Sequence, residues 1–229
     1  MVDKPTVDRM RVASEAAEHV QSGLRRRQDD LYELDARSRT MGPLSDPRAI
    51  IDQAEEVRRA IQIQREDHVS EIAHGLRSAQ DLTMQAGLDG DLSPERARTL
   101  ARVVETASAE TRRLELDLND AARALEPMSQ ATVRDRDFAT TAADSISEAN
   151  SLVESAQRAT FRVVQDLPDI SRELEQTAAD RDQQSEIDVN VEVDMPDVRV
   201  QCAQRSAHQQ HQRSTFSLSR PINTAAPGI

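Results

Sequence analysis

Residues 93–127 read SPERARTLARVVETASAETRRLELDLNDAARALEP, and this stretch decides the fold. It opens on Ser93 and Pro94, a common helix start because serine caps free backbone N–H groups and proline fits the first helical position. Small and apolar residues then recur every three or four positions, which places them on one helix face. This seam comprises Ala97, Leu100, Val104, Ala107, Thr111, Leu114, Leu118, Ala121 and Leu125. The pattern predicts one long helix that ends at Glu126, before Pro127.

The two segments before this stretch repeat the pattern. A first helix is predicted over residues 6–41, stopped by Gly42 and Pro43. A second is predicted from Pro47, capped by Asp46, to about Gly87. Both segments are rich in the strong helix formers Ala, Glu, Arg, Gln and Leu.

The seam of the second helix contains one long step, the eleven residues from Ile61 to Ile72. Such a stutter locally relaxes the left-handed supercoil of packed helices. His68 lies beside the stutter, and Arg27 occupies a seam position of the first helix. Each is either a buried polar group that sets register or oligomer state, or a long side chain that reaches water from the seam's margin.

A fourth helix is predicted from about Ser129 to Leu167. Pro168 should kink or end it, followed by a short helix over residues 169–179. Four helices of similar length joined by short loops favour antiparallel neighbours. We therefore expect an all-α fold over residues 1–180, an up-down-up-down bundle. The rival is a set of coiled-coil hairpins that pair between subunits, and the seams alone do not separate the two arrangements.

After residue 180 the hydrophobic pattern changes from a helical period to a period of two. Ile187 begins an alternation that Pro196 and Asp197 interrupt, and it continues in a shifted phase from Val198 to Cys202. The pattern predicts a linker and a half-buried β segment over residues 181–202, either a hairpin or a bent edge strand. Because an isolated strand is marginal in water, this segment should need a partner. The candidate interaction residues are Val189, Val191, Val193, Met195, Val198 and Val200.

Residues 203–229 are rich in Ser, Gln, His and Arg, a composition typical of a tail that is disordered when alone. The tail differs in charge from the rest of the chain. Residues 1–197 hold 25 basic and 41 acidic side chains, whereas residues 198–229 hold four arginines and no acidic side chain, so the net charge of −12 divides into −16 and +4. The candidate interaction residues here are Arg205, Arg213 and Arg220.

Two sets of side chains raise the question of a metal site. Glu71 and His74 form a Glu-x-x-His pair, which occurs in di-metal carboxylate bundles together with a second such pair and further glutamates. The chain has no second pair, so a solvated helix face is favoured. Cys202, His208 and His211 lie close in sequence, but a polar tail explains them as well. A metal-binding or catalytic bundle stays open as the rival function, with carboxylates such as Glu15, Glu18, Glu105 or Glu110.

Composition excludes several classes of protein. The lone Cys202 excludes an internal disulfide framework, and no stretch approaches the roughly 20 apolar residues that span a bilayer. The N-terminus lacks the apolar core of a signal peptide, so we expect a soluble, unexported chain, cytoplasmic or within a soluble assembly. The negative net charge disfavours nucleic acid as a partner.

One Tyr, three Phe and no Trp leave few side chains for a ligand pocket. We found no glycine-rich phosphate loop and no nucleophile motif, and we predict no catalytic, cofactor-binding or metal-binding residue. The sequence favours a non-enzymatic structural or assembly protein, such as a virion, appendage or scaffold component, which joins a homo-oligomer or larger complex through its C-terminal segment. A signalling or adaptor bundle is the remaining alternative.

Overall fold

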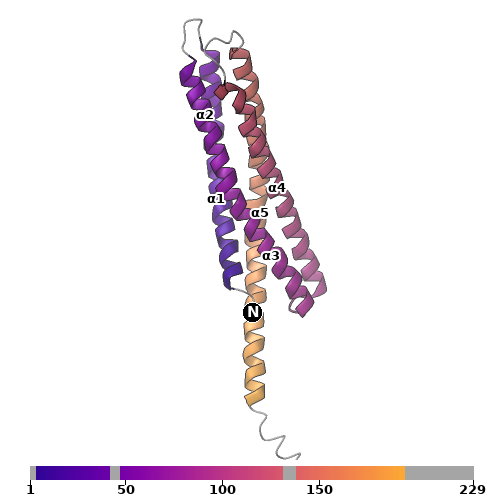
Figure 1. Cartoon of the computed structure of the whole chain (residues 1–229). Helices are drawn as coiled ribbons and strands as arrows, with labels where there is room; N and C mark the ends of the chain where they lie inside the picture. The colour runs from indigo at the N-terminus through magenta and orange to yellow at the C-terminus, as the bar shows by residue number, and fades with distance from the viewer. Residues whose placement is uncertain (1–3, 42–46, 131–137, 194–229) are drawn as a thin grey trace, which may run out of the picture. The chain divides into compact units, whose positions relative to one another are not determined.

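The computed structural model describes residues 4–41, 47–130 and 138–193, and it divides the chain into two units, Met1–Asp180 and Arg181–Ile229. The described residues form five α-helices and one π-helix, with no strand among them. In chain order these are α1 (Lys4–Arg39), α2 (Arg48–Ile63), the π-helix η1 (Gln64–Val69), α3 (Ser70–Asp89), α4 (Pro94–Gln130) and α5 (Phe138–Val193) (Figure 1). The all-α fold predicted from the sequence is confirmed.

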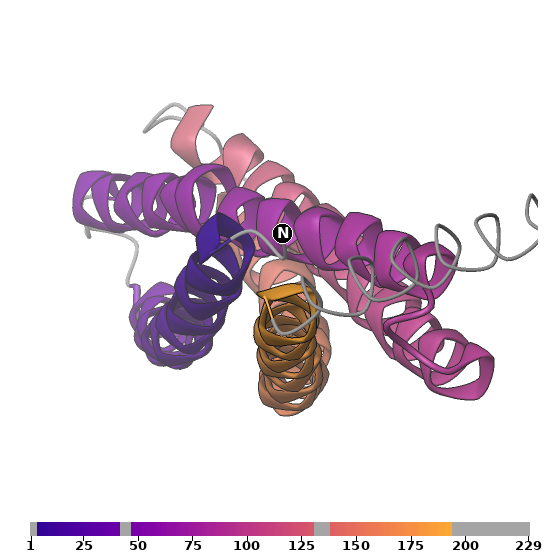
Figure 2. The same ribbon diagram turned by 90° about the horizontal axis from the view of Figure 1, so that it is seen from below.

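Four long helical runs build the first unit, because α2, η1 and α3 follow one another without a break. Arg37, late in α1, donates a hydrogen bond to Gln53 of α2, and Arg9, early in α1, donates one to Ser78 of α3. These two hydrogen bonds show that the first two runs are antiparallel. The second run packs on α1 and α4 (Figure 2), and side-chain hydrogen bonds tie α5 to α1 and α4. The result is an antiparallel four-helix bundle.

The predicted seams form the core of this bundle. In α4 every predicted seam residue is buried except Ala97, which is half-buried. Alanines alternate with larger side chains along all four runs, which lets the helix axes approach closely. The largest fully buried side chains are Met10, Leu24, Leu31, Leu34, Ile61, Ile72, Leu76, Leu114, Leu118, Leu125, Met128 and Leu167. In this structure the seams therefore pair within one chain, as the bundle prediction requires.

The π-helix η1 occupies the stutter. A strict alternation of three and four would carry the seam from Ile61 to residue 71 in ten positions, but the chain takes eleven to reach Ile72. A π-turn accommodates one more residue per turn than an α-turn and so absorbs this extra residue. Val69, at the end of η1, is buried, and the seam resumes in phase from there. The stutter is thus a local π-turn in an otherwise α-helical run.

Several helix ends follow the predicted signals. The backbone N–H of Arg96 donates to Ser93 Oγ at 3.3 Å, so Ser93 caps α4 as predicted. The second run ends at Asp89 rather than near Gly87, and Gly90 follows in the left-handed conformation with φ of 82°. Asp46, Gly42 and Pro43 lie outside the described residues.

Pro127, expected to follow the end of a helix, and Pro168, expected to kink or end one, both lie inside helices. Pro127 falls in the last turn of α4, which continues to Gln130, and α5 passes through Pro168 without ending. Leu167 and Ile170 flank Pro168 and are fully buried. A proline costs a helix one hydrogen bond and some strain, and here packing of the flanking seam outweighs that cost.

The largest difference from the sequence prediction concerns the β segment. α5 continues to Val193, so Ile187–Val193, predicted as the first part of a strand, is helical. A helix satisfies its own backbone hydrogen bonds, whereas a strand needs a neighbouring strand, and the described residues provide none. The rest of the predicted strand and the tail, residues 194–229, lie outside the described residues.

Candidate interaction sites

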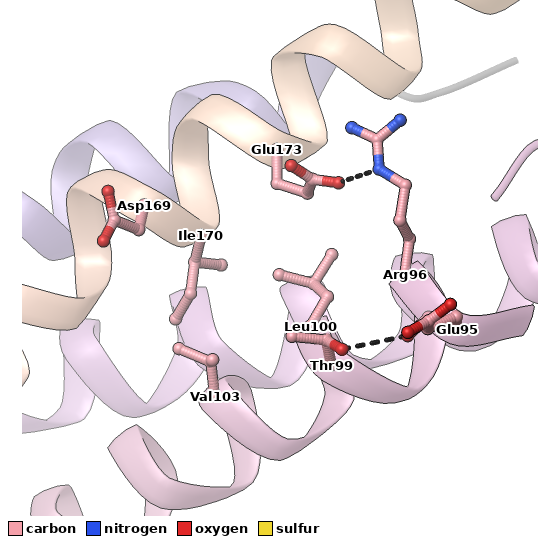
Figure 3. Close-up of a pocket in the computed structure, with 8 residues that line it drawn as sticks. All are labelled: Glu95, Arg96, Thr99, Leu100, Val103, Asp169, Ile170 and Glu173. Carbon is pink, nitrogen blue, oxygen red and sulfur yellow. Dashed lines mark hydrogen bonds and ion pairs between the residues drawn. The ribbon is translucent and has the colours of Figure 1, made fainter. Parts of the chain in front are cut away.

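A groove between α4 and α5, near the start of α4, has a volume of about 420 Å³. Its floor is apolar, because Leu100 and Val103 of α4 face Ile170 of α5 (Figure 3). Polar side chains surround this floor, and those lining the groove are Glu95, Arg96, Thr99, Asp169 and Glu173. The side-chain ridges of two packed helices leave such a groove where small or polar residues replace large ones. We call this site the α4/α5 groove.

The charged rim of the α4/α5 groove has more carboxylates than guanidinium groups. Arg96 Nε donates to Glu173 at 2.7 Å (Figure 3), and Glu173 raises the pKa of Arg96. Asp169 accepts a hydrogen bond from Arg172 at 3.0 Å. Among the described residues, the Glu95 carboxylate has no side-chain partner. The groove can therefore accept a cationic group without first breaking an ion pair.

Negative charge extends along α5 from this groove. Burial raises the pKa of Asp166, and the neighbouring carboxylates of Asp169 and Glu110 raise it further. Glu110 itself pairs with Arg162 across the α4–α5 contact. A cation near this part of α5 would relieve repulsion between carboxylates, which adds to the attraction of the groove for basic groups.

A second groove, between α1 and α5, has the opposite charge. Its volume is about 330 Å³, and its lining residues are Gln21, Arg25, Gln157, Arg158, Phe161 and Arg162. Phe161 is 52% exposed, as is Tyr32 further along α1. Its three arginines make this groove a local basic surface on an acidic bundle. Arginine and aromatic side chains are also enriched at protein interfaces. Sequence reasoning missed this groove, because its residues come from helices that the fold alone brings together.

The π-helix brings together a polar cluster. The imidazole rings of His19 and His68 stack with their centroids 5.6 Å apart, and His68 Nδ1 lies 3.8 Å from a Glu71 carboxylate oxygen. Gln64 Oε1 is buried and has no hydrogen-bond partner among the described residues. The sequence marked His68 as notable beside the stutter, but it gave no signal for His19.

Arg27, the other polar residue noted in a seam, lies at the seam's margin. Its guanidinium pairs with Asp30 at 3.0 Å, and its side chain keeps 21% of its surface exposed. It thus reaches towards water, and does not form a buried charge in the core.

The candidate metal ligands are dispersed in the structure. Glu71 and His74 are both exposed on α3, and the Glu71 carboxylate lies 3.8 Å from the imidazole of His68. Glu15 pairs with Arg11 at 3.4 Å, and Glu110 pairs with Arg162. Glu18 and Glu105 are exposed. Within residues 4–41, 47–130 and 138–193, no three His, Cys, Asp or Glu side chains come together as metal ligands would.

The structure does not place the side chains that sequence analysis selected for interaction. Val189, Val191 and Val193 belong to the last turns of α5, and nothing is described beyond their helical backbone. The other members of this set lie outside the described residues, as do the cysteine and histidines of the tail: Met195, Val198, Val200, Arg205, Arg213, Arg220, Cys202, His208 and His211.

Comparisons with protein families, with curated proteins and with solved structures gave no significant match to this chain. Within the described part of the chain, no helix has the length and apolar character that crossing a membrane requires.

Proposed function

We propose that this chain is a non-enzymatic assembly protein, in which an acidic helical bundle joins copies of itself into a larger structure through its C-terminal segment. The observation that carries the proposal is the separation of core and charge along the chain. Leu174 and Thr177 are the last buried residues of α5 among the side chains that the structure describes. The basic residues 198–229 follow it, with a net charge of +4 against −16 for the residues before them.

The closed core supports a protein in which the bundle folds on its own and the C-terminal segment links the copies. The bundle buries its seams within one chain, so the C-terminal segment is not needed to complete it. A segment of opposite charge to the body is attracted to the surface of another body over the Debye length, about 8 Å at physiological salt. The same charges oppose direct body-to-body contact, which leaves the segment as the favourable link between copies.

The test compares the mass of the full chain with that of a variant that stops after Val193. The variant keeps the whole of α5 and every core residue that the structure describes as buried. We expect the full chain to be an oligomer and the variant a monomer by light scattering on a sizing column, with equal helix content by circular dichroism. A full chain that is monomeric at all concentrations, or a variant that assembles as the full chain does, would overturn the proposal.

A further inference from the structure

We propose that the α4/α5 groove of one copy binds the C-terminal segment around Val198, Arg199 and Val200 of a second copy. This inference rests on the proposed function and names the surface that receives the segment. The groove is lined by an apolar floor and an acidic rim, and the segment holds one cationic side chain, Arg199, between two valines.

The chemistry of the two partners matches residue by residue. In an extended segment Val198 and Val200 project to one side and Arg199 to the other. The two valines fit the floor made by Leu100, Val103 and Ile170, and a groove of about 420 Å³ holds a few such side chains. Arg199 then projects away from the floor, and its long side chain must bend back over the edge of the groove to reach the rim, where Glu95 has no side-chain partner among the described residues. An arginine–carboxylate pair adds direction to the apolar contact.

A groove between helices also suits a segment that lacks a strand to pair with. The described residues contain no sheet edge, so the segment cannot add to a sheet of the bundle. Side chains that enter pockets provide the contact instead, and Cys202 continues the apolar face of the segment.

A second copy is the occupant that the proposed function requires, because a segment bound to the groove of its own chain would not link copies. The net charges of −16 for residues 1–197 and +4 for residues 198–229 favour this contact between two chains.

The other groove on the bundle suits the C-terminal segment less well. The basic groove between α1 and α5, which contains Arg25, Arg158 and Arg162, would repel the arginines of the segment. It therefore serves as an internal comparison, since substitutions there should not weaken assembly through the C-terminal segment.

The test blocks the groove with Thr99→Arg. Thr99 is exposed and lines the groove, so the new guanidinium occupies the mouth and repels Arg199. The matched control is Thr106→Arg, because Thr106 is also exposed on α4 and, like Thr99, donates its hydroxyl to the carbonyl four residues earlier. We expect Thr99→Arg to weaken assembly at least about tenfold, since like charges placed against each other at an interface are strongly unfavourable. Thr106→Arg should assemble as the native chain does.

A mixing experiment then tests whether the contact joins two copies. Thr99→Arg has a blocked groove and a complete segment, whereas the variant that stops after Val193 has an open groove and no segment. Each alone should be monomeric by light scattering, and the mixture should form one-to-one pairs that grow no further.

Each alternative outcome has a distinct meaning. Normal assembly of Thr99→Arg overturns the groove but leaves the proposed function in place, and so does a mixture that forms no pairs. Equal loss of assembly in both threonine variants also overturns the groove, because charge anywhere on α4 would then suffice. A monomeric native chain overturns the proposed function together with this inference.

Discussion

The α2–η1–α3 run and α4 pack against each other in the bundle and have the same kind of sequence, yet only α4 is α-helical throughout. The seam of α4 alternates by three and four from Ala97 to Leu125, and its helix is uninterrupted. The neighbouring run has one residue too many between Ile61 and Ile72 and forms a π-turn there. The core is therefore preserved at the expense of local helix geometry, since one π-turn keeps every later seam residue buried.

The extra residue also changes the chemistry of the surface. Around η1 the chain carries stacked imidazoles of His19 and His68 and the buried Oε1 of Gln64, which has no partner among the described residues. Among the described side chains of α4, Thr111 is the one buried polar residue, and its hydroxyl donates to the carbonyl oxygen of Ala107 within the helix. Half-buried Asp117 of α4 also has a buried Oδ2 without a hydrogen-bond partner among the described residues. The difference between the two runs is therefore the pair of stacked imidazoles at η1.

Single-residue deletions in the two runs should give the largest difference in stability between them. Deletion of the exposed Glu66 from η1 shortens the eleven-residue step to ten and restores strict alternation, so the bundle should keep a cooperative unfolding transition. Deletion of the exposed Glu115 from α4 turns Leu118 and Leu125 away from the core. At about 2–5 kcal/mol for each lost leucine, this removes much of an ordinary stability of about 5–15 kcal/mol.

Urea unfolding followed by circular dichroism at 222 nm measures both deletions. The outcome against our account is an equal loss of stability in the two variants. That result would mean that η1 is a required part of the fold and not an accommodation of one surplus residue.

Two glycines sharpen the comparison at the contact of the interrupted run with α1. A Cβ on Gly75 would lie 2.5 Å from the Cβ of Ala13 and 3.1 Å from the carbonyl oxygen of Arg9. Gly75→Ala should therefore cost about 1–3 kcal/mol, because helix backbones must separate. A Cβ on Gly23 meets only the side-chain amide of Gln64, which can move away.

Gly23→Ala should be close to neutral, since the higher helix propensity of alanine contributes about 1 kcal/mol against the cost of moving Gln64. Thermal unfolding of both variants provides the measurement. A larger loss in Gly23→Ala than in Gly75→Ala would show that Gln64 is held rigidly beside η1.

Two carboxyl groups give the smallest effects, with opposite signs. Hydrogen bonds from Arg58 and Arg59 lower the pKa of Glu55 in α2 from 4.5 to about 2, against a smaller effect of burial. Its ion pairs therefore stabilise the fold above pH 4.5, and this contribution disappears as the pH falls towards 2. Glu55→Gln should lose about 1 kcal/mol or less at pH 7, because the pairs are partly exposed.

Asp166 of α5 behaves in the opposite way, because burial raises its pKa. Its ionised form opposes folding at neutral pH, and this penalty disappears as the pH falls below the ordinary value of 3.8. Asp166→Asn should therefore raise the unfolding midpoint at pH 7 and have no benefit at pH 3. Melting curves at both pH values decide the point, and a destabilised Asp166→Asn at pH 7 would contradict the assignment.

The seams made most of the fold predictable, because a spacing of three and four determines which helix face is buried. Ser93 and the interruption after Ile61 were both visible as local patterns. The course of α5 was not, since continuation through Pro168 depends on packing against other helices. The α4/α5 groove was also beyond the sequence, because Leu100 and Ile170 lie far apart in the chain and meet only through the fold.

The central claim is that the bundle closes within one chain, and a cross-link between α1 and α5 tests it most directly. Gln157 Nε2 donates to Gln28 Oε1 at 2.9 Å, so Gln28→Cys and Gln157→Cys, with Cys202→Ser to remove the native thiol, can be joined by a short thiol cross-linker. The account predicts cross-linked single chains on a denaturing gel, at any protein concentration. Covalent dimers as the main product would show that the helical seams pair between chains, and would contradict it.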